Sequence, residues 1–218
     1  MSASSSPLTT GLNAWEMELF WGKHKRRIRI GAIVLGIVIL GTLIFFMRDY
    51  RIRQASETLL ARASTAEQLQ KLILKYPSSN AAASALLLLA AEKRNAGNLG
   101  EADALYQKFL KRFPQHSLAP GAALGIVENI LAAGRRDEGI SALQTLAAKY
   151  PTSYVAPFAL FTQADLLAFL PGQAPEAKKQ LRDLNRQFPD SVSARYSINL
   201  LVLLGAQEGS PKEKKPIK

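Results

Sequence analysis

Few side chains in this sequence could carry acid–base, nucleophilic or metal chemistry. The chain of 218 residues has two histidines, His24 and His116, and no cysteine, which excludes disulfides, thiolate metal sites and cysteine nucleophiles. His24 lies in a basic cluster and His116 in an expected loop, and the sequence has no motif of zinc proteases, serine hydrolases or phosphate-binding loops. Asp137 and Glu138 follow a turn, where the dipole of the next helix accounts for acidic residues. We therefore expect no enzyme and no bound metal or cofactor.

A repeated pair of an aromatic residue and a proline indicates which elements position the remaining side chains. The pair occurs four times, at Tyr76–Pro77, Phe113–Pro114, Tyr150–Pro151 and Phe188–Pro189. Successive pairs are 37, 37 and 38 residues apart. A fixed period in this range is typical of a solenoid, in which each unit buries its apolar face by stacking on its neighbours. The sequence therefore predicts a protein that works by presenting a surface.

Each of these prolines follows a stretch with the apolar spacing of a helix. A leucine or tyrosine stands seven residues before each aromatic, and an apolar residue follows it three positions later: Leu69 and Leu72, Tyr106 and Phe109, Leu143 and Leu146, Leu181 and Leu184. A spacing of three keeps both residues on one helical face. Gly97, Gly134 and Pro171–Gly172 separate the two helices of their units, and serines after three of the prolines could cap the next helix: Ser79, Ser153 and Ser191. The expected fold class is all-α, built of helical hairpins.

The second helix of each unit resembles the tetratricopeptide repeat. That pattern has a small residue, an apolar or aromatic residue four positions later and a closing proline; the matching sets are Ala102, Tyr106 and Pro114; Gly139, Leu143 and Pro151; Ala177, Leu181 and Pro189. The resemblance implies three copies (82–114, 119–151 and 156–189), a degenerate copy at 52–77 and a final helix at 192–205 that caps the end. It also places Tyr106 between the two helices of its own unit.

The same resemblance implies which residues line a binding groove. In tetratricopeptide arrays the first helix of each unit generally lines the concave face. The residues expected to face a groove for a peptide partner are Ser84, Leu87, Arg94, Leu124, Glu128, Leu131, Thr162 and Asp165. The alternative is that these residues pack against each other or against the final helix.

A second informative segment, residues 30–47, contains 18 residues without a charge. At about 1.5 Å per residue it would span about 27 Å, close to the hydrocarbon thickness of a bilayer. Basic residues flank it on both sides, which disfavours a buried solenoid helix. A cleaved signal peptide remains an alternative, although the long charged region ahead of the span and the lack of small residues after it disfavour cleavage. We expect a retained transmembrane helix at 30–47.

The basic residues also favour one orientation of this span. Five lysines or arginines lie in the seven residues before it, and four lie in the 15 residues after it. The denser cluster is expected to stay in the cytoplasm. The predicted organisation is a cytoplasmic basic tail at 1–29, the transmembrane helix at 30–47, a repeat domain at 48–205 and a disordered basic tail at 206–218. The repeat domain would lie outside the cytoplasm, in the periplasm if the protein is bacterial.

The net charge of the chain is +11, and residues 48–218 alone carry 23 basic and 15 acidic residues. The basic residues are scattered over the helix faces and form no arginine–aromatic stripe, so we interpret them as a solvated surface and expect no nucleic acid as a partner. The expected partners are protein segments, the membrane through residues 30–47 and, as an alternative, further copies of the chain.

The order of these parts resembles a more specific family. A short tail with Glu-Leu-Phe-Trp at 18–21, a basic juncture, one span and then tetratricopeptide-like repeats resemble the ancillary subunit of the bacterial SecYEG translocon. The aromatic–proline repeats are also similar to those of the Tol-Pal coordination protein and an outer-membrane assembly lipoprotein. The resemblance implies a single-pass inner-membrane adaptor whose periplasmic repeats work with the translocon or a chaperone. A self-assembling structural envelope protein is the competing hypothesis.

Overall fold

The computed structural model describes residues 14–209, and that part of the chain is helical without any β-strand. The helices are α1 (Ala14–Arg62), α2 (Ala66–Lys75), α3 (Asn80–Asn95), α4 (Leu99–Arg112), α5 (Ala119–Ala132), α6 (Arg136–Lys149), α7 (Val155–Ala168), α8 (Ala174–Gln187) and α9 (Val192–Gly209). The predicted all-α fold class is confirmed. The chain divides into two compact units, one up to Ala55 and one from Ser56 onwards, and α1 passes from the first into the second.

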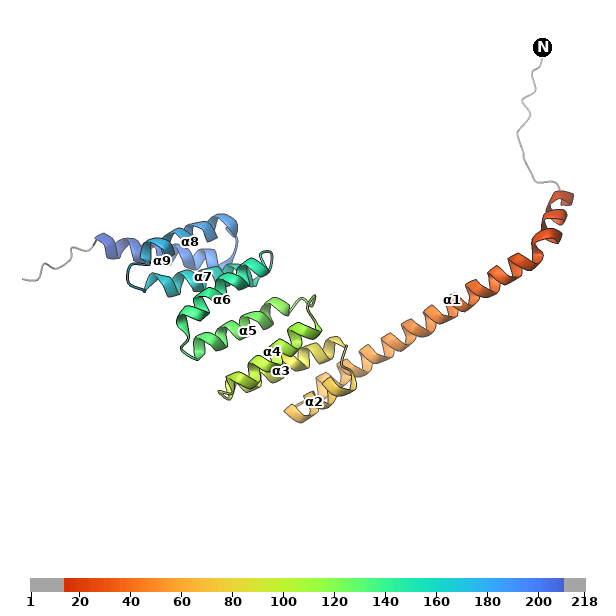
Figure 1. Cartoon of the computed structure of the whole chain (residues 1–218), viewed down its shortest axis with the longest axis horizontal. Helices are drawn as coiled ribbons and strands as arrows, with labels where there is room; N and C mark the ends of the chain where they lie inside the picture. Colours follow the sequence, from red (N-terminus) through yellow and green to blue (C-terminus); the bar gives the residue numbers. More distant parts are fainter. Residues whose placement is uncertain (1–13, 210–218) are drawn as a thin grey trace, which may run out of the picture. The chain divides into compact units, whose positions relative to one another are not determined.

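The first unit consists of the larger part of α1 (Figure 1). By length and composition, α1 is the described helix that could cross a membrane. Every residue from Ile30 to Met47 is exposed, so the alternative of a helix buried in the solenoid is wrong. Of the predicted N-terminal tail, residues 1–13 lie outside the described part of the chain, whereas α1 already begins at Ala14.

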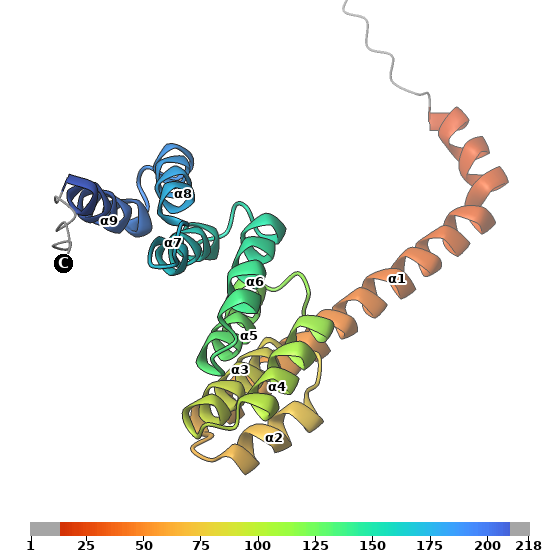
Figure 2. The ribbon, with the colours of Figure 1, turned by 60° about the vertical axis from the view of Figure 1, so that its left-hand side comes forward.

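The second unit is a series of helical hairpins. Helices α3 and α4, α5 and α6, and α7 and α8 pack in pairs, and α9 packs against α7 and α8 (Figures 1 and 2). These pairs coincide with the three predicted repeat copies. The last turns of α1 and helix α2 occupy the place of the degenerate copy. Helix α9 continues to Gly209, so it includes the first four residues of the predicted C-terminal tail; the rest of that tail lies outside the described residues.

The turns between helices follow from particular residues. Gly97 and Gly134 have φ angles of 80° and 76°, in the left-handed region that glycine adopts without strain, and each stops the first helix of its unit. At the proline turns, Ser79 and Ser191 accept hydrogen bonds from the amides of Ala82 and Ala194, at 3.1 and 3.0 Å. These two predicted caps are confirmed.

Two other turn residues behave differently from each other. The Ser153 hydroxyl donates to the carbonyl of Tyr150 at 2.8 Å, and α7 has no side-chain cap, so the capping role predicted for Ser153 is wrong. His116 is a turn residue, as expected: its Nδ1 accepts from the amide of Leu118 at 3.1 Å. Its ring lies edge-on to Phe109, with centroids 5.5 Å apart.

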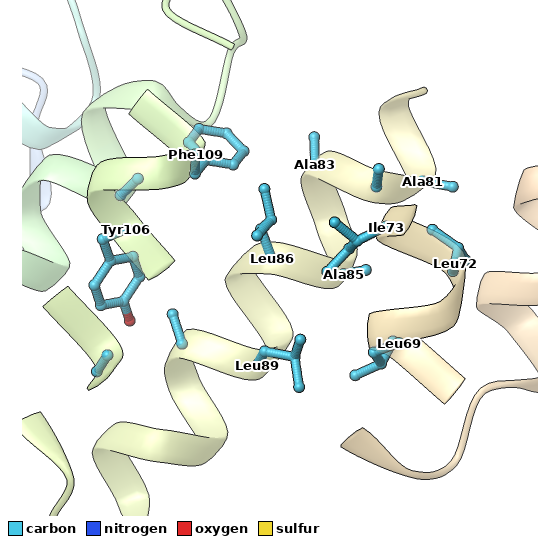
Figure 3. Close-up of a cluster of buried hydrophobic side chains, with 14 of the residues drawn as sticks. Leu69, Leu72, Ile73, Ala81, Ala83, Ala85, Leu86, Leu89, Tyr106 and Phe109 are labelled. Atoms are coloured by element: carbon cyan, nitrogen blue, oxygen red, sulfur yellow. The ribbon is translucent and has the colours of Figure 1, made fainter. Parts of the chain in front are cut away.

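A continuous buried cluster joins α2, α3 and α4 (Figure 3). Leu72, Leu86 and Phe109 are almost fully buried in it, and burial of side chains of this size contributes about 1.5–3 kcal/mol each. Tyr106 belongs to the same cluster, but its ring also reaches the next repeat. A Cβ atom added to Gly125 of α5 would lie 2.5 Å from the Tyr106 ring. The predicted position between the helices of one unit is therefore incomplete, because Tyr106 also fills the space that Gly125 leaves between units.

Candidate protein-binding groove

A groove of about 880 Å³ lies across α5, α7 and α9 in the second unit. We call it the aromatic groove. Its lining is mostly apolar: Leu124, Tyr154, Val155, Pro157, Phe158, Phe161, Asp190, Ser191, Val192, Ser193 and Tyr196. Because α5, α7 and α9 each follow a proline turn, the groove is built from the first helices of successive units.

Helix α7 supplies the largest side chains of this groove. Tyr154, Phe158 and Phe161 are spaced by four and three residues, so they share one face of α7 and its N-cap. Four of the seven buried residues of α7 are alanines, Ala156, Ala159, Ala164 and Ala168; the others are Val155, Pro157 and Gln163. The helix can therefore pack closely through its alanines while Tyr154 and Phe158 stay exposed, at 66 % and 42 %. Phe161 is half-buried against a core cluster.

Helices α5 and α9 form the other walls. Tyr196 of α9 lies beside Phe161, with ring centroids 6.2 Å apart. On α5, a Cβ atom added to Gly121 would lie 2.6 Å from the Tyr154 hydroxyl. The absence of a side chain at Gly121 thus makes room for the Tyr154 ring. Asp190 is the charged residue in the lining.

This arrangement is suited to binding a peptide. Apolar grooves with aromatic walls accept the anchor side chains of an extended or helical peptide. Among the residues that the structure describes, no three histidine or acidic side chains gather in a way that could hold a metal ion. His116 is half-buried against Phe109 and Phe113, away from the groove lining.

Comparison with protein families supports the repeat assignment. The family described as "Tetratricopeptide repeat" matches residues 84–116 and 122–153, which cover most of α3 and α4 and most of α5 and α6. The chain contains tetratricopeptide repeats. No curated protein matches the sequence. Tetratricopeptide repeats typically form scaffolds for protein–protein interaction, which is the class of function that the fold supports.

The eight residues that the sequence predicted to face a groove lie in different environments in the structure. Leu124 lines the aromatic groove. Arg94 and Glu128 form an ion pair that joins α3 to α5, so these two side chains bind each other. Leu87 and Leu131 are half-buried against hydrophobic clusters. Ser84, Thr162 and Asp165 are half-buried and do not line the aromatic groove.

Sequence reasoning missed most of the aromatic groove. Of its lining, only Leu124 was among the predicted groove residues, and the aromatic residues Tyr154, Phe158, Phe161 and Tyr196 were not. One signal could have identified them. The alanines of α7 recur at the small packing positions of the tetratricopeptide repeats, such as Ala82, Ala119 and Ala156, which assigns the other face of α7 to its aromatic residues.

A smaller groove of about 390 Å³ lies on α2, α3 and α4. Leu74 is its most exposed apolar side chain, and Lys93 and Glu101 form an ion pair of 2.6 Å at its edge. The hydrogen bond within this ion pair raises the pKa of Lys93. It joins the end of α3 to the start of α4 and stabilises that turn.

Proposed function

We propose that this protein is a membrane-anchored, non-catalytic adaptor that binds a segment of a protein partner in the aromatic groove. The observation that carries the proposal is the exposure of Tyr154, Phe158 and Tyr196 on tetratricopeptide repeats whose cores are filled by other residues. Exposed aromatic side chains in a concave surface are the usual anchors of protein interfaces. The partner segment would place apolar side chains between α5, α7 and α9.

The anchor is α1. Its apolar run, Ile30–Met47, has the length of a bilayer span and carries no buried side chain. The dense basic cluster before the span supports a cytoplasmic N-terminus, with the repeats on the other side of the membrane. In a bacterial cell this is a single-pass protein of the inner membrane with a periplasmic repeat domain. Work with the translocon or a periplasmic chaperone, as in the SecYEG ancillary family, fits this arrangement of parts.

The groove can be tested in the full-length protein in its native membrane. In a Phe158→Lys, Tyr196→Lys double variant, two charges enter the aromatic groove at exposed positions, so the helical melt should change little. Recovery of crosslinked partners should fall by at least about tenfold, as expected when interface anchors are lost. Leu88→Lys is the matched control, since Leu88 is 52 % exposed on a first helix but lies outside the groove lining. Equal recovery from both variants would place the binding site elsewhere.

The orientation has its own test. Protease added to intact spheroplasts should digest the chain beyond residue 50 and spare the N-terminal tail. Digestion only after the membrane is opened would contradict the proposed topology while leaving the groove proposal intact.

Self-assembly in the envelope is a second candidate function. The observation that favours it is the exposure of Ile198 and Val202 on α9, which could pair with another copy of the chain. Light scattering on the detergent-solubilised full-length protein separates the two functions, because the adaptor is expected as a monomer and the structural protein as a stable oligomer.

A further inference from the structure

Helix α9 continues the register of the first helices. Its buried residues Ser193, Ala194 and Ser197 stand 38 positions after residues that are buried on α7: Val155, Ala156 and Ala159. Both helices also pack against α8. In the repeat architecture, α9 therefore has the place of the first helix of a fourth unit.

One position on each first helix faces the second helix of the same unit. It is occupied by Ala90 in α3, Val127 in α5 and Ala164 in α7, spaced by 37 residues. All three are buried, in clusters that include residues of α4, α6 and α8 respectively. The counterpart on α9, 38 residues after Ala164, is Val202, which is 68 % exposed.

Neighbouring residues on α9 extend the exposed surface around Val202. Ile198 stands one turn before Val202 and is exposed, whereas its counterpart is half-buried on α7 (Leu160) and fully buried on α3 (Leu86). Arg195 precedes Ile198 by three residues and Val202 by seven, so it lies on the same face. We call Arg195, Ile198 and Val202 the open stripe. Asn199, which is also exposed, stands between Arg195 and Val202 on this face, so the open stripe adjoins polar groups at its edge, while Ile198 and Val202 supply its apolar surface.

The second helices of the other units define what fits the open stripe. Each carries a small residue, a large apolar one four positions later and another three positions after that, all buried: Ala102, Tyr106 and Phe109; Gly139, Leu143 and Leu146; Ala177, Leu181 and Leu184. The small residue allows close approach of the paired helices. A Cβ atom on Gly139 would lie 2.2 Å from a methyl group of Leu131.

We propose that α9 binds, in trans, one amphipathic helix of a protein partner that completes the fourth repeat. The partner helix has the spacing small–x3–large apolar–x2–large apolar and runs antiparallel to α9, as the second helix of a hairpin does. The proposal extends the adaptor function, but it uses a surface separate from the aromatic groove.

The charge of Arg195 selects among such helices. It lies near the start of α9, where an antiparallel partner would present its C-terminal end. The second helices of this chain end in basic residues: Lys111 and Arg112, Lys149, and Arg186. A helix of this kind exchanged from a second copy would bring like charges together. A partner helix with acidic residues in its last turn would pair with Arg195 instead.

The lack of cysteine in the chain allows a direct test on the detergent-solubilised full-length protein. Val202→Cys introduces a single thiol at an exposed site. The probe is a synthetic peptide of residues 98–113, with cysteine at the position of Ala102 and glutamate at those of Lys111 and Arg112. Leu203→Cys is the matched control, because Leu203 is exposed on the same helix but points about 100° away from the open stripe.

We expect the disulfide with the peptide to form at least about tenfold faster at residue 202 than at residue 203. Labelled peptide without cysteine should bind the unmodified protein about tenfold more tightly with the acidic end than with the native basic end, and Arg195→Glu should reverse that order. Equal reaction at both cysteines, no binding of the peptide or an unchanged preference in Arg195→Glu would each overturn the proposal. Disulfide-linked dimers through residue 202 that exclude the peptide would also overturn it, by assigning the open stripe to a second copy.

The test is independent of the aromatic groove. The Phe158→Lys, Tyr196→Lys variant should bind this peptide normally, because neither residue belongs to the open stripe. If peptide binding fails while partner recovery still depends on Phe158 and Tyr196, only the fourth-repeat proposal is wrong. If the peptide binds but partner recovery is unaffected by the groove variant, only the groove proposal is wrong.

Discussion

Helices α3 and α7 hold equivalent places in their repeats, but they present different surfaces. Ser84 and Leu87 of α3 stand two repeats before Phe158 and Phe161 of α7. On α3, Leu87 packs against the hydrophobic core, and an ion pair between Arg94 and Glu128 joins α3 to α5. At the α7 end, aromatic side chains line an open groove. The repeat thus fixes the backbone and the buried positions, while the side-chain types on the first helices decide which of them carries the aromatic groove.

The comparison between core and groove aromatics predicts the largest effect. Tyr106→Ala should lower the free energy of unfolding by about 3–5 kcal/mol, since Tyr106 is buried between α4 and Gly125 of α5. Tyr154→Ala should cost less than about 1 kcal/mol because that ring is largely exposed. Urea unfolding followed by circular dichroism measures both. Similar losses would mean that the groove aromatics are part of the core.

A smaller effect is expected where a glycine makes room for an aromatic ring. Gly125→Ala should destabilise the protein by about 1–3 kcal/mol, because the new methyl group would overlap the Tyr106 ring. Gly100→Ala is the control: it lies in α4 with no atom within 4 Å of the added Cβ, so alanine should stabilise the helix by up to about 1 kcal/mol. Thermal melts of the two variants should shift in opposite directions. A shared direction would contradict the placement of Tyr106 over Gly125.

The smallest effect concerns the ion pair at the α3 end. Arg94→Ala should lower the free energy of unfolding by about 1 kcal/mol or less, because Arg94 and Glu128 are each about one-third exposed. In a double-mutant cycle with Glu128→Ala, the coupling should weaken as salt is added. A coupling free energy of several kcal/mol would contradict this expectation and show that the ion pair is a major stabilising contact between the repeats.

Much of the fold could be predicted because short-range rules govern it. The aromatic–proline period predicted the helical hairpins, and Gly97 and Gly134 predicted the turns between their helices. The charge-free run at 30–47 corresponds to the exposed part of α1. Ser153 departed from the pattern because α7 begins one residue later in its repeat than α3 does, with Tyr154 and not Ser153 as the N-cap. The Ser79 hydroxyl bonds to both a carbonyl and a helix amide, whereas the Ser153 hydroxyl bonds to the carbonyl of Tyr150. Local sequence does not fix the first residue of a helix to within one position.

The groove depended on long-range packing, which the sequence does not encode locally. Helix α7 is apolar almost all round, so its periodicity cannot tell which face its neighbours cover. The sequence by itself determined the number and order of hairpins, since caps, glycine turns and prolines act within a few residues. Only the tertiary structure decided that α7 packs through its alanines and leaves Phe158 and Phe161 to the groove. Only the tertiary structure also showed that Val202 is exposed whereas Ala164, its counterpart on α7, is buried, because exposure depends on which helix lies alongside.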